Sequence, residues 1–157
     1  MEELTLKSTI QVTKMEELSE IEQALINNAI EAASHSYAPY SRFCVGSAVL
    51  LRNGKTVTGC NQENVSYPAG ICAERVAIYS AGAQYPDTPI DILAIAARGT
   101  DGMLLEEPVN PCGICRQVMV EAETRFNTPI RILLYGTKYV YIIDGIQALM
   151  PLSFTRL

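Results

Sequence analysis

The stretch Ile90-Asp-Ile-Leu-Ala-Ile-Ala-Ala-Arg98 decides the fold class of this chain. It is an almost unbroken apolar run, which is typical of a strand in a sheet that is covered on both faces. A sheet covered on both faces needs helices on each side. The run therefore predicts a central strand in a three-layer α/β/α sandwich.

A β-hairpin is predicted before this central strand. Residues 45–52 and 55–62 have strand-like sequences, and Asn53-Gly54 joins them. Asn-Gly is a strong hairpin signal because both turn residues must accept positive φ. Two more strands are predicted at residues 129–136 and 138–143, so we expect a mixed five-stranded sheet.

Helical spacing of apolar side chains predicts three helices and a short fourth one, at about residues 14–34, 73–83, 112–125 and 145–150. The first helix is expected to begin with a capping box formed by Thr13 and Glu16. No repeat, low-complexity tract or linker interrupts this order of elements.

The segment ahead of the first helix has its own pattern. Apolar and polar side chains alternate over residues 4–13, which predicts an extra, half-buried N-terminal strand. We expect it to cover a sheet edge or a subunit contact. The predicted organisation is an N-terminal strand extension over residues 1–13 and a single domain over residues 14–157.

The composition describes a globular chain of 157 residues, 48% hydrophobic and 18% charged, with a formal net charge of -5. This acidic balance argues against a nucleic-acid partner, since polynucleotide binders carry clustered Lys and Arg. The start Met1-Glu2-Glu3 is acidic, and no apolar stretch approaches the roughly 20 residues that cross a bilayer. We expect a cytoplasmic protein without a membrane partner. Five Cys exclude a fully paired disulfide framework and suit free or metal-bound thiolates.

A candidate metal site lies at two predicted helix starts. Cys112-Gly-Ile-Cys115 alone could be a thioredoxin-like redox pair, half of a structural zinc site or a coincidence. Cys72 also stands at a helix start, two residues before Glu74. Helix N-termini favour thiolate over thiol, and two of them can converge on one cation and supply three thiolates. The fourth position of a tetrahedral zinc would be open to water, which is the arrangement of a catalytic site.

The other candidate ligands have simpler interpretations. Cys44 and Cys60 lie in the predicted hairpin strands and are interpreted as inert core thiols, and His35 as a solvated or hydrogen-bonded side chain. Three thiolates and Zn²⁺ sum to a charge of -1, which weakens the metal as a Lewis acid. We therefore expect Arg75, Arg116 or both to donate hydrogen bonds to the sulfurs.

Cys72-Ala-Glu-Arg75 and Pro111-Cys-Gly-Ile-Cys-Arg-Gln117 together resemble the cytidine deaminase family, in its small, homotetrameric, three-cysteine branch. Residues 37–46 and 59–64 extend the resemblance, which covers roughly residues 16–154. It implies a cytidine deaminase-like fold and one Zn²⁺ per subunit, held by Cys72, Cys112 and Cys115. Residues 4–13 lie outside the usual core of that family, and residues 120–126 differ from its usual continuation after the second cysteine pair.

The resemblance also implies an activity in pyrimidine salvage. Cytidine and 2′-deoxycytidine would be hydrolysed to uridine and 2′-deoxyuridine with release of ammonia. Water activated by zinc would attack C4 of the base, and Glu74 would be the catalytic proton shuttle. Zinc deaminases with a non-ligand Glu are a known class of such sites.

A pocket for the nucleoside is implied in the same way. Asn61 and Glu63 would hydrogen-bond the ribose 3′-hydroxyl, Phe43 would pack near the nucleoside, and the backbone at Ala73 would help read the pyrimidine edge. Phe154 of a neighbouring subunit would close over the base. From the residues alone, positions i and i+2 of a strand project from one face, so an amide and a carboxylate there can reach one diol. Neither is positive, as expected for a substrate without phosphate.

Three alternatives stay open. Residues 151–156 also resemble the tail of blasticidin S deaminase, so a cytosine-containing antibiotic nucleoside is an alternative substrate. A polynucleotide-editing deaminase would need a basic track and stacking aromatics, and the chain has no Trp. A non-catalytic zinc-binding module would need a fourth protein ligand such as Cys60 or Cys44, and would leave Glu74 without a role.

Overall fold

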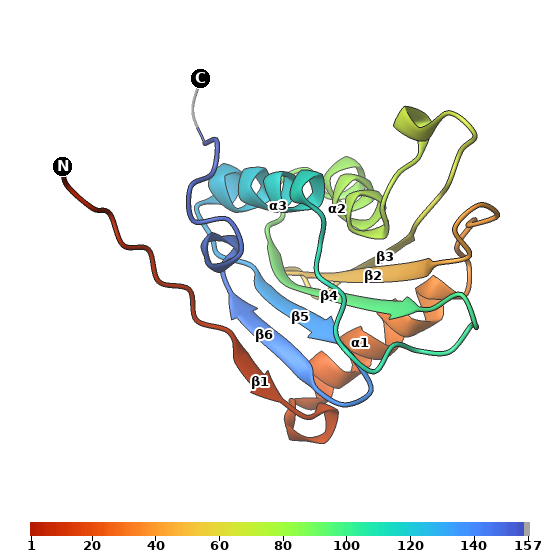
Figure 1. The fold of residues 1–157 in the computed structure, drawn as a ribbon. Helices are drawn as coiled ribbons and strands as arrows, with labels where there is room; N and C mark the ends of the chain where they lie inside the picture. Colours follow the sequence, from red (N-terminus) through yellow and green to blue (C-terminus); the bar gives the residue numbers. More distant parts are fainter. Residues whose placement is uncertain (156–157) are drawn as a thin grey trace.

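The computed structural model describes residues 1–155, which build a six-stranded mixed sheet in the order β1-β6-β5-β4-β2-β3 (Figure 1). The strands are β1 (Gln11–Thr13), β2 (Cys44–Leu51), β3 (Thr56–Cys60), β4 (Ile90–Arg98), β5 (Arg131–Tyr135) and β6 (Val140–Asp144). β4 and β5 run parallel, and every other neighbouring pair is antiparallel. The expected mixed five-stranded sheet is confirmed, with β1 as the sixth strand at its edge.

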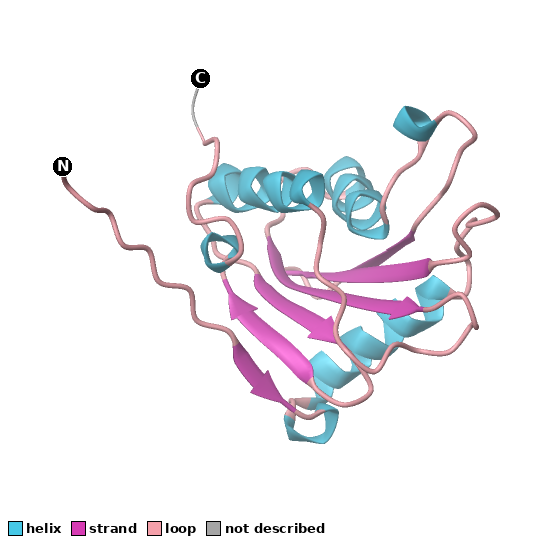
Figure 2. Ribbon diagram, viewed as in Figure 1, coloured by secondary structure: helices cyan, strands magenta, loops and turns pink. Residues whose placement is uncertain are grey.

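Helices cover both faces of this sheet (Figures 1 and 2). α1 (Glu20–Ala33) lies on one face, and α2 (Ala73–Gln84) and α3 (Gly113–Phe126) lie side by side on the other. Three short 3₁₀ turns complete the elements: η1 (Met15–Glu17), η2 (Tyr67–Ala69) and η3 (Ile146–Ala148). The three-layer α/β/α sandwich predicted from the central apolar run is confirmed. Within residues 1–155, none of the helices is both long and apolar enough to span a bilayer.

β4 has the predicted bounds, and its side chains contribute to two hydrophobic cores, one on each face of the sheet. Leu93 and Ile95 are buried beneath α2 and α3, while Ala94 and Ala96 are buried against α1. The small side chains on the second face allow α1 to approach the sheet closely. At Gly46 of β2 an added Cβ would lie 1.9 Å from a backbone oxygen of α1, so backbone packs directly on backbone there.

The predicted hairpin is formed by β2 and β3. Gly54 in its turn has φ of 81°, but Asn53 does not have a positive φ, so only one of the two turn residues adopts the left-handed conformation expected from Asn-Gly. β3 ends at Cys60, two residues earlier than expected. The residues just beyond it therefore leave the sheet ladder and are free to contact a neighbouring loop.

The N-terminal strand is shorter than the alternating pattern suggested. β1 pairs with β6 through three residues only, with Gln11 opposite Ile142 and Thr13 opposite Val140. Residues 1–10 run as an extended segment away from the body of the molecule (Figure 1). If this register continued, Thr9 would face Asp144, which is the last residue of β6. β6 is therefore too short to pair with the residues that precede Thr9.

α1 begins later than expected, because a different capping box starts it. Ser19 is its N-cap: Glu22 N donates to Ser19 Oγ (3.4 Å), and Ser19 N donates to Glu22 Oε2 (2.9 Å). The expected box of Thr13 and Glu16 was wrong. Thr13 instead donates its hydroxyl to Glu17, and this part of the chain forms the turn η1.

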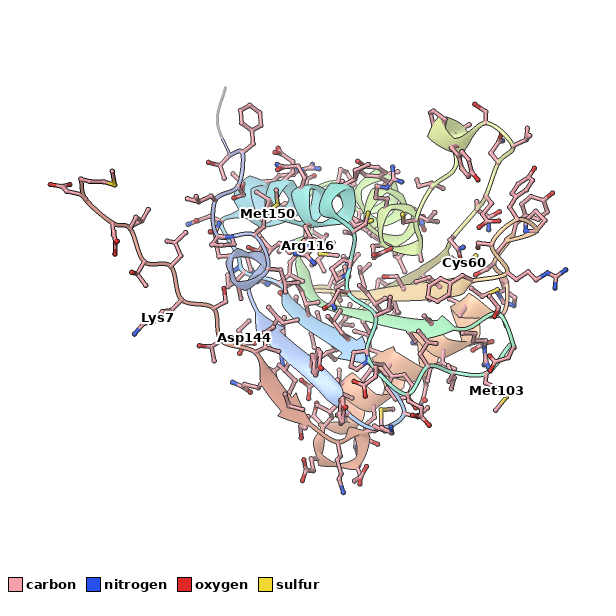
Figure 3. The ribbon with its side chains drawn as sticks, in the orientation of Figure 1. Lys7, Cys60, Met103, Arg116, Asp144 and Met150 are labelled. Carbon is pink, nitrogen blue, oxygen red and sulfur yellow. The ribbon has the colours of Figure 1, made fainter. Side chains whose placement is uncertain are left out.

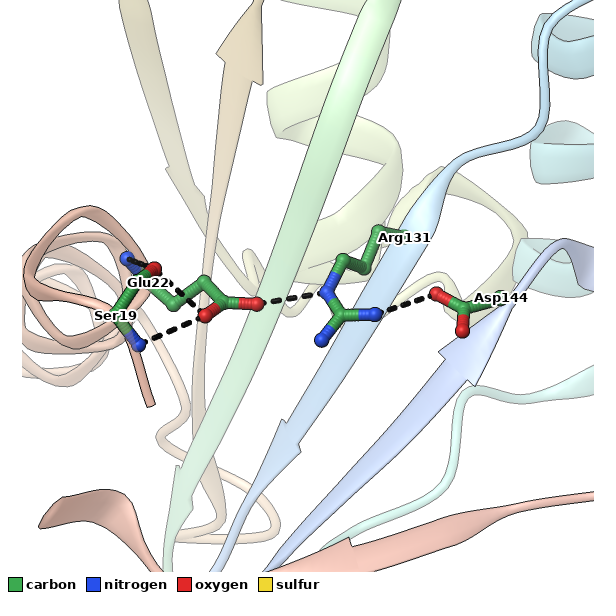
Figure 4. Close-up of polar contacts among 4 residues, drawn as sticks. All are labelled: Ser19, Glu22, Arg131 and Asp144. Atoms are coloured by element: carbon green, nitrogen blue, oxygen red, sulfur yellow. Dashed lines mark hydrogen bonds and ion pairs between the residues drawn. The ribbon is translucent and has the colours of Figure 1, made fainter. Parts of the chain in front are cut away.

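Glu22 also connects α1 to the sheet through a hydrogen-bonded ion pair with Arg131 (Figure 4). Its Oε1 accepts a hydrogen bond from Arg131 Nε at 2.7 Å, and Arg131 Nη1 donates to Asp144 Oδ1 at 2.7 Å. Burial acts to raise the pKa of Glu22, but the hydrogen bonds from Ser19 and Arg131 prevail and lower it. One carboxylate therefore both caps the helix and orients it over β5 and β6.

Candidate metal centre and active site

Three cysteine sulfurs meet where α2 and α3 begin. Cys72 is the N-cap of α2, Cys112 is the N-cap of α3, and Cys115 is buried in the first turn of α3. Their three Sγ atoms lie within 4.8 Å of one another. Over residues 1–155 no other group of three or more Cys, His, Asp or Glu side chains gathers in this way.

This donor set fits a zinc ion. Zinc–thiolate bonds of about 2.3 Å in tetrahedral geometry place sulfurs roughly 3.8 Å apart, which agrees with the observed spread. Cys44, Cys60 and His35 are not among the clustered ligands, so the part of the chain that the structure describes offers no fourth Cys or His. The arrangement has three protein ligands and one open position, which distinguishes a catalytic zinc site from a structural one.

The thiols of the cluster influence one another strongly. A hydrogen bond from Cys115 lowers the pKa of Cys72 to about 5, and Arg75 and Cys112 act in the same direction. The pKa of Cys115 is raised, first by its hydrogen bond to Cys72 and then by burial. The opposite directions mean that the two thiols compete for one negative charge. A divalent cation among the sulfurs removes that competition, because a coordinated thiol is deprotonated.

Two arginines follow the key residues, and only one of them reaches sulfur. Arg75 Nη2 donates to Cys72 Sγ at 3.6 Å. Arg116 instead donates from Nε to Pro111 O and from Nη1 to Leu149 O, both at 2.9 Å. Figure 3 shows Arg116 beside the C-terminal segment that carries Met150. Arg75 therefore acts on the charge of the cluster, whereas Arg116 fixes the backbone that leads into α3.

Glu74 lies in the first turn of α2, directly beside the sulfur cluster. It is only 5% exposed, and this burial raises its pKa, with the charge of Cys72 adding to the rise. A carboxyl group with a raised pKa can both accept and return a proton near neutral pH. Ala73 before it is fully buried, and its N–H, like the others of the first turn, lacks an acceptor within the helix.

Asn61 follows the last residue of β3, and its side-chain amide makes two hydrogen bonds to the backbone of its own chain. Its Oδ1 accepts a hydrogen bond from Val45 N at 2.8 Å, and its Nδ2 donates to Phe43 O at 2.9 Å. The side chain thus fixes the backbone on both sides of the start of β2. Phe43 itself is half-buried at this point. One N–H of the Asn61 amide is left for a further acceptor.

Glu63 is engaged in the same way with the turn that precedes β2. Its carboxylate accepts from Tyr40 N at 2.9 Å, from Ser41 N at 3.2 Å and from the Ser41 hydroxyl. The hydrogen bond from Ser41 is the main cause that lowers the pKa of Glu63. The turn contains Arg42 at φ of 57°, a left-handed conformation that the sequence did not signal. Ser41 lies within residues 37–46 of the resemblance, but sequence analysis assigned no role to it.

Phe154 lies near the end of the described residues, where the C-terminal segment contacts α3. Its ring is 65% exposed, and its carbonyl accepts from Gln117 Nε2 of α3 at 2.7 Å. The backbone is thus attached to α3 while the aromatic ring points to solvent. The structure brings Cys72, Cys112, Cys115, Glu74, Ala73 and Arg75 together, and it places Asn61, Glu63 and Phe43 in a second group around the turn before β2.

Gly59 is a further residue that motif analysis did not single out. A Cβ at this position of β3 would lie 2.5 Å from Ala77 N and 2.7 Å from Ala73 O, so α2 packs directly on the strand backbone. A glycine inside a strand is the signal that could have found it, since it often marks a close approach of another backbone. This contact sets the distance between the sheet and the helix that carries Cys72 and Glu74.

The chain resembles known proteins over most of its length. Residues 19–127 match the family described as the cytidine and deoxycytidylate deaminase zinc-binding region. The cytidine deaminase of Halalkalibacterium halodurans is 46% identical over 99 residues, which are 63% of this chain and 70% of that protein. The cytidine deaminase of Mycobacterium tuberculosis is 42% identical over 113 residues, 68% of this chain and 77% of that protein. The crystal structure of the cytidine deaminase from Burkholderia pseudomallei matches with a TM-score of 0.73 at 34% identity, over 87% of this chain and 100% of that one.

Proposed function

Because this chain belongs to the cytidine and deoxycytidylate deaminase family, we propose that it deaminates free cytidine and 2′-deoxycytidine, with Glu74 as the residue that carries protons. Its activity is that of a zinc-dependent cytidine deaminase, and its zinc is bound by Cys72, Cys112 and Cys115. The observation that carries the proposal for Glu74 is its burial beside a three-sulfur cluster that leaves one position open.

Zinc, when bound, supplies a Lewis acid that lowers the pKa of water to about 7. The protein adjusts the charge of the site. Arg75 contacts Cys72 Sγ and withdraws negative charge from the thiolate set. The helix N-termini that carry Cys72 and Cys112 act in the same direction through their unpaired N–H groups.

Glu74 handles the protons of the reaction. It takes a proton from the attacking water and passes it to N3 of cytosine, which makes C4 more electrophilic. The water oxygen forms a bond to C4. Glu74 then takes the remaining proton of that oxygen and gives it to the exocyclic amine, and the C4–N4 bond breaks to release ammonia and leave a carbonyl at C4. Burial supports this role because it raises the pKa of Glu74 and keeps bulk water from competing for the proton.

The sugar is proposed to bind at the turn before β2. The Glu63 carboxylate has more acceptor positions than its loop hydrogen bonds use, and the Asn61 amide retains one N–H. A ribose 3′-hydroxyl can donate to Glu63 and accept from Asn61. Phe43 would pack near the nucleoside, and the buried N–H groups at Ala73 would read the base edge.

We propose that the enzyme assembles as a homotetramer in the cytoplasm. The exposure of Phe154 supports assembly, because an exposed aromatic side chain whose backbone is attached to α3 could close over the base in a neighbouring subunit. The five cysteines are all free, which suits a reducing compartment. Size-exclusion chromatography with light scattering tests the assembly: a monomeric mass at working concentration would contradict it.

The substrate class is tested with the purified zinc-loaded protein. Cytidine, 2′-deoxycytidine, blasticidin S and a cytosine-containing oligonucleotide are incubated separately, and base absorbance and ammonia are followed. We expect turnover of the two nucleosides and no release of ammonia from the oligonucleotide. Preferred turnover of blasticidin S would replace the nucleoside assignment. Cys112→Ala is the matched control for the metal and should lose zinc by atomic absorption; a full zinc complement would contradict its assignment as a ligand.

A further inference from the structure

We propose that residues 1–10, the N-terminal arm, pair as an antiparallel strand with the same arm of a second copy of this chain. The arm lies outside residues 19–127, the part of the chain that matches the deaminase family. It is also separate from the sulfur cluster, which is built from α2 and α3. The proposal therefore adds an interaction surface to the enzyme and leaves its chemistry unchanged.

The first observation is that the arm continues an open sheet edge. β1 is an edge strand of three residues, and among the described residues the arm before it pairs with no strand. An extended segment with free N–H and C=O groups is a template for another strand. Natural edges are often protected by Pro or by bulges, and the arm has no Pro. Its charged residues are Glu2 and Glu3 at its start and Lys7.

The second observation is an uncovered apolar side of the arm. Leu4, Leu6 and Ile10 alternate with polar residues and are 76%, 45% and 39% exposed. Their own chain covers them only in part, and a groove of about 490 Å³ lies beside Leu6, between the arm and Asp144 of β6 and Pro151. Figure 3 shows Lys7 extending from the arm, away from the sheet.

The third observation selects a second arm as the occupant. In an antiparallel pair centred on Thr5, Leu4 of each copy faces Leu6 of the other, and Glu3 faces Lys7. The twofold symmetry repeats this ion pair on the other side of Thr5. Leu4 and Leu6 of both copies then share one face of the ribbon, beside the pair of Glu2 and Ser8, and the opposite charges of Glu3 and Lys7 share the other. Directly opposed apolar pairs and opposite-charge pairs stabilise a two-stranded ribbon.

Other registers of two arms lose this match. Centring on Lys7 opposes two like charges. Centring on Ser8 aligns Leu6 with Ile10 but places Lys7 opposite Thr9, and Glu3 then faces no positive charge. The Thr5 register also pairs residues 1–9, which is ample for a strand of ordinary length.

The register is tested by disulfide trapping in the full-length, zinc-loaded protein. Thr5→Cys places two thiols opposite each other at the symmetry axis, whereas Ser8→Cys faces Glu2 in the same register. Under mild oxidation we expect a linked dimer of Thr5→Cys on non-reducing gels, and only the wild-type background of linkage for Ser8→Cys. Equal linkage of the two variants, or none above wild type for either, would overturn the pairing. Deamination of cytidine by the same samples verifies that they are folded.

Charge reversal tests the partner. In the Thr5→Cys background, Glu3→Lys alone opposes Lys with Lys, and Lys7→Glu alone opposes Glu with Glu. Each single variant should therefore lose the linked dimer. Mixing the two restores both ion pairs, so linkage should return and join one chain of each kind, as mass spectrometry can show. Linkage that is unaffected by either reversal, or that mixing fails to restore, would show that the arm binds a different surface.

Discussion

Gly59→Ala is the substitution that most directly tests how the sheet positions the active site. The side chain it adds is one methyl group, and Gly59 is neither a zinc ligand nor the proposed proton carrier. Its Cβ would nevertheless lie 2.5 Å from Ala77 N and 2.7 Å from Ala73 O, both backbone atoms of α2. Neither atom can turn away as a side chain can, so the helix has to move.

The required movement follows from these distances. Ordinary van der Waals contacts to Cβ begin near 3.4 Å, so α2 must separate from β3 by roughly 0.7–0.9 Å. Cys72 and Glu74 move with α2, while Cys112 and Cys115 stay on α3. Zinc–ligand distances tolerate only about 0.2 Å, and a misplacement of about 1 Å can cost about 10²-fold in rate. The added strain should lower stability by about 1–3 kcal/mol.

The assay combines turnover, zinc retention and thermal unfolding. We expect kcat/KM for cytidine to fall about 10²-fold, zinc to be lost to a chelator at lower concentration, and Tm to fall by roughly 2–12 °C. Gly82→Ala is the matched control, because it adds the same methyl to α2 where nothing lies within 4 Å. That control should keep its turnover and gain up to about 1 kcal/mol. Wild-type turnover and zinc retention in Gly59→Ala would refute the reasoning.

Further substitutions test individual contacts. Glu74→Gln should keep zinc by atomic absorption and lose at least about 10²-fold in kcat; wild-type kcat would remove Glu74 from the mechanism. Ser41→Ala removes a hydrogen bond to Glu63, so KM for cytidine should rise with little change in kcat. Ser41→Thr should restore the wild-type KM. An unchanged KM in Ser41→Ala would show that this turn does not contribute to sugar binding. Glu22→Gln should cost about 1–2 kcal/mol, since Arg131 is partly exposed and screened by solvent. Burial acts to raise the pKa of Glu22 and its hydrogen bonds lower it, so this stabilisation is present above about pH 4.3. It is lost as the pH falls through the lowered pKa, and urea unfolding curves of the two proteins should therefore converge in acid; a constant difference would contradict the linkage.

Sequence predicted those parts of the fold that local patterns determine. The apolar run of β4 has the predicted bounds, and Asn53-Gly54 forms the turn of the hairpin. The ends of strands were less predictable, because a strand can pair only as far as its neighbouring strand extends. The alternation over residues 4–13 continues beyond the last residue of β6, so most of that segment has no partner within its own sheet.

The candidate site divides in the same way. Cys72 and the Cys112–Cys115 pair were recognisable because helix starts and short spacing are visible in sequence. The contact of Arg75 with Cys72 agrees with the expectation that an arginine donates to the sulfurs. The hydrogen bonds of Arg116 could not be predicted, since one of their acceptors, Leu149 O, is distant in sequence and brought close by the fold. The turn that engages Glu63 was equally hidden, because it depends on tertiary contacts around Arg42.

The two groups of site residues differ in how they are held, and this bears on substrate selection. α2 packs backbone to backbone on β3, whereas the turn before β2 is held to the strand by the side chains of Asn61 and Glu63. If the sugar binds these same two side chains, then the hydrogen bonds that hold the turn also hold the sugar-binding groups in position. Free cytosine would contact the helices alone and would leave that binding energy unused. We therefore expect cytosine to be deaminated far more slowly than cytidine, mainly through kcat/KM; comparable values would show that Asn61 and Glu63 serve the fold and not the substrate.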